Sequence, residues 1–201
     1  MTAAITIDPV SGATCQGPAP KRFTVAEYHR MAEAGLLEES ERFELLGGEI
    51  VYMAPPGSDH GAITDRLPKF FLPRLLNRFC LRVQGAVKLS EDSEPNPDFM
   101  ILTHREDDYR AANPTPEDVL LLVEVAHSSI AFDRSTKLRL YALAGISEYW
   151  VADVRRNELI VHQEPNTATG EYSAIKHHSV TQKIAPQAIP DCELDLAWLF
   201  R

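Results

Sequence analysis

The chain has 201 residues, of which 44% are hydrophobic and 24% charged, and these values fit one globular domain with a full core. No run approaches the roughly 18 apolar residues that a membrane span requires. The first 20 residues lack the basic and apolar regions of a secretory signal, so we expect a cytoplasmic protein without a membrane partner. Three widely separated cysteines without CxxC spacing argue against a disulfide framework and a structural zinc site.

The formal net charge of −9 weighs against a nucleic-acid enzyme, because proteins that bind phosphate backbones usually carry a basic patch. The charge is unevenly distributed, however. Residues 65–88 contain six lysine or arginine side chains, and Asp65 is the single acidic residue among them. This segment predicts either a solvated helix face or a surface that faces phosphate.

The N-terminal region divides into a tail and the start of the domain. Residues 1–20, rich in Ala, Pro, Gly and Thr, predict a flexible tail, and residues 21–201 form the predicted domain. Thr24 and Glu27 have the spacing of a capping box, which predicts the start of a helix that Gly35 ends.

A hairpin and a long helix are predicted next. Two apolar runs within residues 43–53 flank Gly47-Gly48, a pattern typical of a β-hairpin. From residue 59 or 60 to residue 79, apolar side chains recur at helical spacing. Because Pro68 and Pro73 lie inside this segment, we expect a kinked or broken helix.

The rest of the chain alternates short apolar runs with polar segments and one further helical pattern. Residues 119–126 are the most hydrophobic run, which predicts a central strand buried on both faces. The predicted fold class is therefore α/β, a mixed sheet flanked by helices in a single domain. The predicted segments are strands at 83–89, 98–102, 119–126, 148–154, 159–163 and 172–177, a loop at 105–118, a helix from 133 or 134, and a closing segment at 194–200.

Glu124 is unusual because it lies within the most hydrophobic strand. A buried carboxylate is costly unless it is paired, protonated or bound to a metal. Asp98 follows Pro97 at the start of another short strand, and neighbouring strands would bring both carboxylates to one sheet edge. Two carboxylates and a backbone carbonyl, that of Val125, suit Mg²⁺ or Mn²⁺.

Lys137 lies on the predicted helix that follows the Glu124 strand, beside its buried stripe. An ammonium there would neutralise the carboxylates or orient a water that attacks phosphorus. The structural alternative is a buried salt bridge from Glu124 to Lys137, with Asp98 acting only as a turn residue. The spacing leaves both interpretations open.

Several short motifs also resemble those of one family. They are Phe43-Glu44-Leu45-Leu46-Gly47-Gly48-Glu49, Met53-Ala54-Pro55-Pro56 followed by His60, Pro97-Asp98, Glu124-Val125, Asp133 with Lys137 and Tyr141, and Gly145-Ile146-Ser147-Glu148-Tyr149-Trp150. Together they resemble the PD-(D/E)XK nuclease superfamily, most closely its Uma-type branch of bacterial restriction-endonuclease-domain proteins. The resemblance spans about residues 22–200.

The resemblance implies a restriction-endonuclease-like core with a Mg²⁺-dependent phosphodiesterase site. In such a site Asp98 and Glu124 would be metal ligands, Lys137 the catalytic lysine carried on a helix, and Glu44 an additional acidic residue near the metal. The family also implies a homodimer, so that each strand of a DNA duplex meets one site. The aromatic and apolar residues around Tyr149-Trp150 add to this expectation.

Two positions depart from the family pattern. Ala126 stands where the superfamily's Glu-x-Lys motif would place lysine, so activity would depend on Lys137 reaching the site from its helix. His127 stands where this branch more often has serine. We interpret His127 as a structural histidine and His60 as a residue at a helix N-terminus. The alternative is metal ligation for His127, and metal ligation or a role as a base for His60.

Three functions are compatible with these features. The leading hypothesis is a metal-dependent endonuclease that acts on DNA. The second is a nuclease-fold protein that binds nucleic acid or a protein partner without cutting, which the negative charge and the absent strand lysine favour. The third is a related phosphodiesterase acting on RNA, for which the sequence has no specific motif.

Overall fold

The computed structural model describes residues 6–7, 14–15, 19–38, 41–75 and 77–201. Its elements, in chain order, are β1 (Thr6–Ile7), β2 (Thr14–Cys15), α1 (Val25–Glu33), β3 (Arg42–Leu46), β4 (Glu49–Met53), α2 (Ser58–Leu75), β5 (Cys80–Val83), β6 (Phe99–Leu102), η1 (Pro116–Asp118), β7 (Val119–Ala126), α3 (Ile130–Phe132), η2 (Asp133–Lys137), α4 (Leu138–Leu143), β8 (Glu148–Asp153), β9 (Glu158–Asn166), β10 (Glu171–Ser179), β11 (Lys183–Ile184), β12 (Leu194–Asp195) and α5 (Leu196–Leu199).

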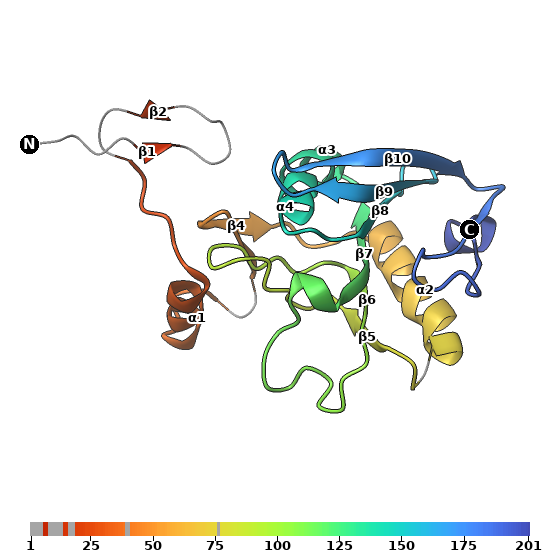
Figure 1. Ribbon diagram of the computed structural model, residues 1–201, viewed down its shortest axis with the longest axis horizontal. Helices are drawn as coiled ribbons and strands as arrows, with labels where there is room; N and C mark the ends of the chain where they lie inside the picture. Colours follow the sequence, from red (N-terminus) through yellow and green to blue (C-terminus); the bar gives the residue numbers. More distant parts are fainter. Residues whose placement is uncertain (1–5, 8–13, 16–18, 39–40, 76) are drawn as a thin grey trace, which may run out of the picture.

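Within the described residues, the central sheet has six strands in the order β10-β9-β8-β7-β6-β5. All neighbouring strands are antiparallel except β7 and β8, which are parallel and joined by the helical segment α3-η2-α4. A parallel pair needs such a crossover, which covers one face of the sheet. The chain therefore forms a mixed α/β sheet flanked by helices, as the sequence predicts (Figure 1).

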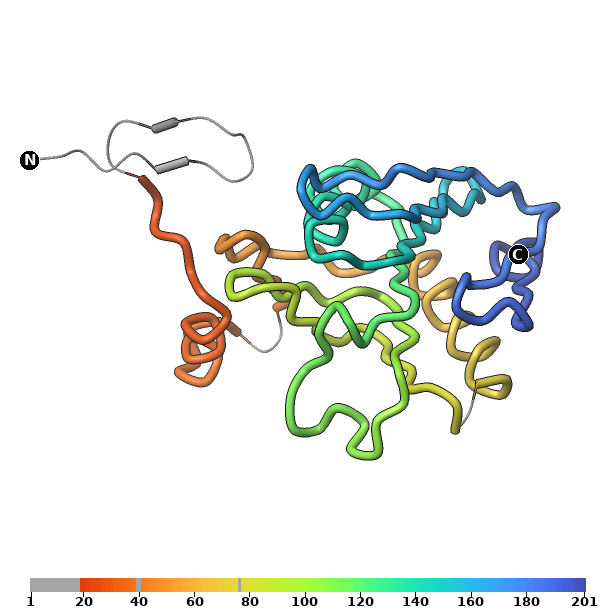
Figure 2. The backbone as a smooth tube through the Cα atoms, in the orientation of Figure 1, coloured from red at the N-terminus to blue at the C-terminus, as the bar shows by residue number. Residues whose placement is uncertain are grey.

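Helix α2 covers one face of the sheet. Its apolar residues, including Leu67 and Phe71, share a buried cluster with the strand residues Phe99, Val123 and Trp150. The C-terminal segment that ends in α5 completes this layer. It lies beside α2 in Figure 2, and Arg66 of α2 donates a hydrogen bond to the Leu199 carbonyl over 2.8 Å.

The other face packs against the crossover helices. Leu122 and Ala126 of β7 share a second buried cluster with Tyr141 and Ala142 of α4. Because side chains alternate along a strand, Val123 and Val125 face α2, whereas Glu124 faces the crossover. A strand that is apolar on both faces can only lie in the centre of a sheet, and β7 does.

Most predicted elements are confirmed. Helix α1 begins after Thr24 with both bonds of the capping box, and β3 and β4 form the predicted hairpin. Its turn residues Gly47 and Gly48 have φ values of 57° and 78°, a left-handed backbone that favours glycine. The central strand has the predicted bounds, 119–126, and strands β8, β9 and β10 match the predicted C-terminal strands within a few residues.

Three local predictions are wrong. The prolines at 68 and 73 do not break α2, which runs through both and ends at Leu75 instead of residue 79; a kink at these prolines stays a prediction. The strand expected at 83–89 lies at 80–83, because Gln84 adopts a left-handed φ of 48° and turns the chain. The crossover helix starts earlier than predicted, at Ile130.

The predicted N-terminal tail lies mainly outside the described residues. The described part includes the short antiparallel pair β1–β2, in which Thr6 is opposite Cys15. Among all described helices, none combines the length and apolarity needed to cross a lipid bilayer.

The aromatic residues Tyr149 and Trp150 lie inside the core. Both are 0% exposed, as a core role requires. Tyr149 donates to the Asp133 carbonyl, and the Trp150 indole donates to Glu148. They cannot form an intermolecular contact, so this reason for expecting a homodimer is wrong.

The packing of α2 on the sheet generates a stability prediction. Leu67→Ala removes a fully buried side chain and should lower the free energy of unfolding by about 2–5 kcal/mol, measured by urea denaturation. Leu72→Ala on the same helix is the control, because Leu72 is 49% exposed. An equal loss in both variants would contradict the assigned face of α2.

Candidate active site

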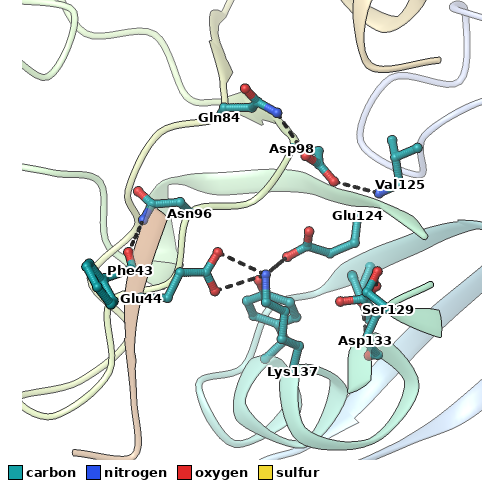
Figure 3. A network of polar contacts seen from close by, with 12 residues as sticks. Phe43, Glu44, Gln84, Asn96, Asp98, Glu124, Val125, Ser129, Asp133 and Lys137 are labelled. Carbon is teal, nitrogen blue, oxygen red and sulfur yellow. Dashed lines mark hydrogen bonds and ion pairs between the residues drawn. The ribbon is translucent and has the colours of Figure 1, made fainter. Parts of the chain in front are cut away.

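One polar pocket of about 130 Å³ lies where β3, β6, β7 and the crossover helix meet. Phe99 of β6 pairs with Val123 of β7, so Asp98 and Glu124 are the next residues at the same end of two neighbouring strands. The predicted residues Glu44, Asp98, Glu124, Val125 and Lys137 all line this pocket. Figure 3 shows Glu44 and Glu124 pointing toward Lys137 from separate strands.

Asp98 is buried and held in one orientation. Its Oδ2 accepts hydrogen bonds from the Val125 backbone N–H (2.9 Å) and His60 Nε2 (3.0 Å), and its Oδ1 accepts from Gln84 Nε2 (3.3 Å). Burial raises the pKa of Asp98, but His60, the Val125 N–H and the charge of Lys137 together outweigh it and lower that pKa below 3.8. Asp98 is therefore ionised and fixed at the pocket wall.

Lys137 bridges two carboxylates in the protein interior, where 2% of its side chain is exposed. Its Nζ donates to Glu124 Oε1 (2.8 Å) and to Glu44 Oε1 (3.2 Å), and it lies 3.0 Å from Glu44 Oε2 without hydrogen-bond geometry. Burial lowers the pKa of Lys137, but the charges of Glu124, Glu44 and Asp133 raise it well above 10.5 overall. The ammonium therefore stays charged.

Glu124 is a buried acid of the pocket whose carboxyl lies between two hydrogen-bond donors. Burial raises its pKa well above 4.5; Lys137 opposes this rise, whereas Asp98, Asp133 and Glu44 add to it. Tyr141 Oη donates to the same oxygen, Oε1, over 2.6 Å. One Glu124 oxygen thus receives two hydrogen bonds, which fixes the carboxyl plane.

The helix that carries Lys137 contains a turn of π-helix at Asp133–Lys137. Such wide turns often occur at functional sites. Both end residues of this turn are buried and line the pocket. Asp133 accepts from Ser129 Oγ (2.6 Å), and burial raises its pKa from 3.8 to about 6, against the opposing effects of Lys137 and Ser129.

More acidic than cationic side chains line the pocket. Four carboxyls, those of Glu44, Asp98, Glu124 and Asp133, line it. Lys137 is their buried cation, His60 adds charge only when protonated, and Arg42 is half-buried. Glu44 Oε2 is buried and receives no hydrogen bond from any described residue. An acidic excess and a buried carboxylate oxygen that lacks a hydrogen bond fit the oxygen donors that Mg²⁺ or Mn²⁺ requires.

The described residues contain no group of three or more His, Cys, Asp or Glu side chains arranged to hold a metal ion. The predicted set has two carboxylates, those of Asp98 and Glu124, with the Val125 carbonyl, and metal binding by it stays a prediction. The structure contains features of both interpretations of the sequence. Lys137 forms the buried salt bridge, and Asp98 lies in the same pocket. His127 lines the pocket and is half-buried.

Three partners in the site were not assigned these roles from the sequence. His60 lies in the first turn of α2, as expected, but also binds Asp98. Tyr141 binds Glu124, and Asp133 is a fourth acid of the pocket. Asp133, Lys137 and Tyr141 recur at intervals of four, so a polar stripe within an otherwise apolar helix face was the available signal.

The raised pKa of Asp133 predicts a pH-dependent stability. The folded protein binds this proton more tightly than the unfolded chain, so the contribution of Asp133 to the free energy of unfolding falls as the pH rises from about 4 to above 6. Asp133→Asn removes the effect and keeps an acceptor for Ser129. In EDTA, the unfolding free energy of this variant relative to wild type should therefore increase by about 3 kcal/mol between pH 4 and pH 7.

Urea denaturation at several pH values measures this difference. Asp65→Asn, at an exposed position on α2, is the control and should follow the wild-type pH profile. A constant difference between Asp133→Asn and wild type across the range would show that Asp133 does not titrate as a buried acid.

Comparison with known proteins assigns the chain to a family. In a crystal structure described as "a putative nuclease belonging to DUF820 from Anabaena variabilis ATCC 29413", the fold is similar, with a TM-score of 0.66. That match has 14% sequence identity and covers 89% of this chain and 97% of the other, so it supports the fold alone. No protein of curated function matches the chain. Residues 25–197 match the Uma2 family, described as "Putative restriction endonuclease", and the chain therefore belongs to the Uma2 family.

Proposed function

We propose that this protein is a metal-dependent endonuclease that hydrolyses phosphodiester bonds in DNA with Mg²⁺ or Mn²⁺. Membership of the Uma2 family supports nuclease chemistry in general. The observation that carries the finer proposal is the acidic excess of the buried pocket, in which four carboxyls surround one buried ammonium. A divalent cation would balance this charge without protonation of Glu124 and Asp133.

Asp98, Glu124 and the Val125 carbonyl would hold the metal, and Glu44 Oε2 supplies a further oxygen nearby. When bound, the metal would polarise a phosphoryl oxygen and increase the acidity of a bound water. The hydrogen bonds from His60 and the Val125 N–H hold Asp98 in place for this role. Ligands that are already oriented reduce the entropy lost on binding.

Lys137 would act as a cation in this mechanism. Its pKa is raised by the surrounding carboxylates, so Nζ has no free lone pair with which to accept a proton. A fixed ammonium can stabilise the negative charge that develops on the phosphate oxygens during cleavage. It thereby takes the role of the lysine that the superfamily motif places at Ala126.

Binding without cleavage is the second candidate function. It is favoured by the net charge of −9 and by the engagement of Lys137 with two carboxylates in the described structure. A homodimer, which would present two sites to a duplex, also stays a prediction, and sedimentation velocity of the purified protein would test it.

Cleavage assays test the leading proposal. Purified wild-type protein should cleave supercoiled or single-stranded DNA with Mg²⁺ or Mn²⁺ and should be inactive in EDTA. Asp98→Asn, which keeps the shape of the side chain, should abolish cleavage. Lys137→Met should reduce the rate constant by about 100-fold or more, because it removes a cation from the reacting phosphate.

Matched controls separate site effects from general charge effects. Asp191→Asn and Lys176→Met change the same residue types at exposed positions and should retain wild-type rates. Circular dichroism of each variant verifies folding. If folded wild-type protein cleaves neither DNA form with either metal, the enzyme proposal fails and the binding function takes its place.

Metal binding can be measured without activity. Calorimetric titration with Mn²⁺ should show a site that Asp98→Asn weakens at least 10-fold, in the range expected for loss of a ligand-sphere group. Affinity should rise between pH 5.5 and pH 7.5, because burial raises the pKa of the ligand Glu124, which must release its proton to bind metal, and because neighbouring Asp133, with a pKa raised to about 6, becomes negatively charged in this range. Equal affinity in the wild type and Asp98→Asn would exclude Asp98 as a ligand.

A further inference from the structure

The acidic pocket is too small to hold a nucleotide. Its volume of about 130 Å³ compares with roughly 30 Å³ for each water in the liquid, so it has room for an ion and a few waters. A second, larger groove of about 540 Å³ lies next to it, between α1, β3 and the start of β6. That volume is within the roughly 300–1,000 Å³ of small-molecule sites.

The two hollows share three residues, Arg42, Glu44 and Asn96, which therefore mark their boundary. Arg42 and Glu44 are two residues apart on β3, so their side chains leave the strand on the same face. Glu44 turns into the acidic pocket and contacts Lys137. Arg42 is half-buried, and no described residue forms a hydrogen bond or ion pair with its guanidinium.

The side chains that line the groove suit a nucleobase better than a phosphate. Besides Glu44 at the boundary, three carboxylates line it, those of Glu33, Glu38 and Glu41, and they would repel a phosphate placed deep inside. They can accept hydrogen bonds from the amino groups of a base. Tyr28 supplies an aromatic ring whose hydroxyl is anchored on the Phe43 carbonyl over 3.0 Å, and rings of this kind stack on bases.

At the boundary between the groove and the acidic pocket, Arg42 carries a positive charge. Arginine presents paired N–H donors that match two phosphate oxygens, and Arg42 is the cationic member of the groove lining. A phosphate held there would lie beside Glu44 and the acidic pocket, with its nucleoside in the groove.

We propose that this groove is a nucleotide subsite in which Arg42 binds the phosphate next to the acidic pocket and the groove along α1 takes the attached nucleoside. The proposal deepens the nuclease function above and rests on it for the identity of the substrate. It adds a site and a phosphate-binding residue that the metal centre does not require.

Binding of 2′-deoxycytidine 3′,5′-bisphosphate, whose base carries an amino group, tests the proposal in EDTA without any cleavage. Calorimetry should show binding to the wild type. Arg42→Gln should weaken it about 10-fold or more, because a charge-assisted hydrogen bond to phosphate is lost. Ala32→Trp, at an exposed position on α1 that lines the groove, should weaken it as well by occupying the space of the nucleoside.

Arg110→Gln is the matched control, because Arg110 is exposed on the 103–118 loop and lies outside the groove lining. Its affinity should equal that of the wild type. Arg42→Gln and Ala32→Trp should still bind Mn²⁺, which shows that the metal pocket is folded. Unchanged affinity for the bisphosphate in either groove variant, or no binding by the wild type, would overturn the proposal.

Cleavage assays separate this inference from the proposed function. If wild-type protein cleaves DNA, Arg42→Gln should raise KM more than it lowers kcat, and unchanged kinetics would overturn the inference while the nuclease function stands. If the wild type does not cleave but binds the bisphosphate through Arg42, the nucleotide subsite stands and the nuclease function fails.

Discussion

The ammonium of Lys137 is the point on which the site depends. It is buried between Glu44 of β3 and Glu124 of β7, two strands from separate parts of the chain. An isolated charge at this depth would be very costly, and so would each carboxylate without the lysine. Each partner therefore needs the others, and the ion pairs tie the β3–β4 hairpin, the central strand and the crossover helix into one arrangement.

Backbone geometry determines which acids meet. The antiparallel register of β6 and β7 puts Asp98 beside Glu124, and the Val125 N–H binds Asp98 directly. The turn of π-helix at 133–137 directs Asp133 and Lys137 to the same pocket. A shift of one residue in β7 would turn Glu124 toward α2 and into an apolar cluster, because side chains alternate between the two faces.

The shifted pKa values of the pocket carboxyls link this architecture to chemistry. Burial and mutual repulsion raise the pKa values of Glu124 and Asp133, whereas hydrogen bonds lower that of Asp98. Acids whose pKa values are shifted in opposite directions within one pocket are typical of functional sites, and structural ion pairs shift pKa values as well. Here the salt bridge and the candidate metal site share Glu124 and lie in the same pocket, so a structural and a functional role do not exclude each other.

Local patterns were enough to predict much of the fold. The capping box at Thr24, the glycine turn of the hairpin and the continuous apolar run at 119–126 depend on neighbours in sequence, and all three are confirmed. The importance of Glu124 was also evident from the sequence, because a carboxylate in such a run is costly wherever the strand packs.

The predicted end of α2, the predicted start of the crossover helix and the predicted position of β5 were wrong. These boundaries depend on packing and on the left-handed backbone of Gln84. The pairing of Asp98 with His60, the depth of Asp133 and the position of Arg42 between two hollows required the tertiary structure. Each depends on contacts or spacing between segments distant in sequence, which no local pattern encodes.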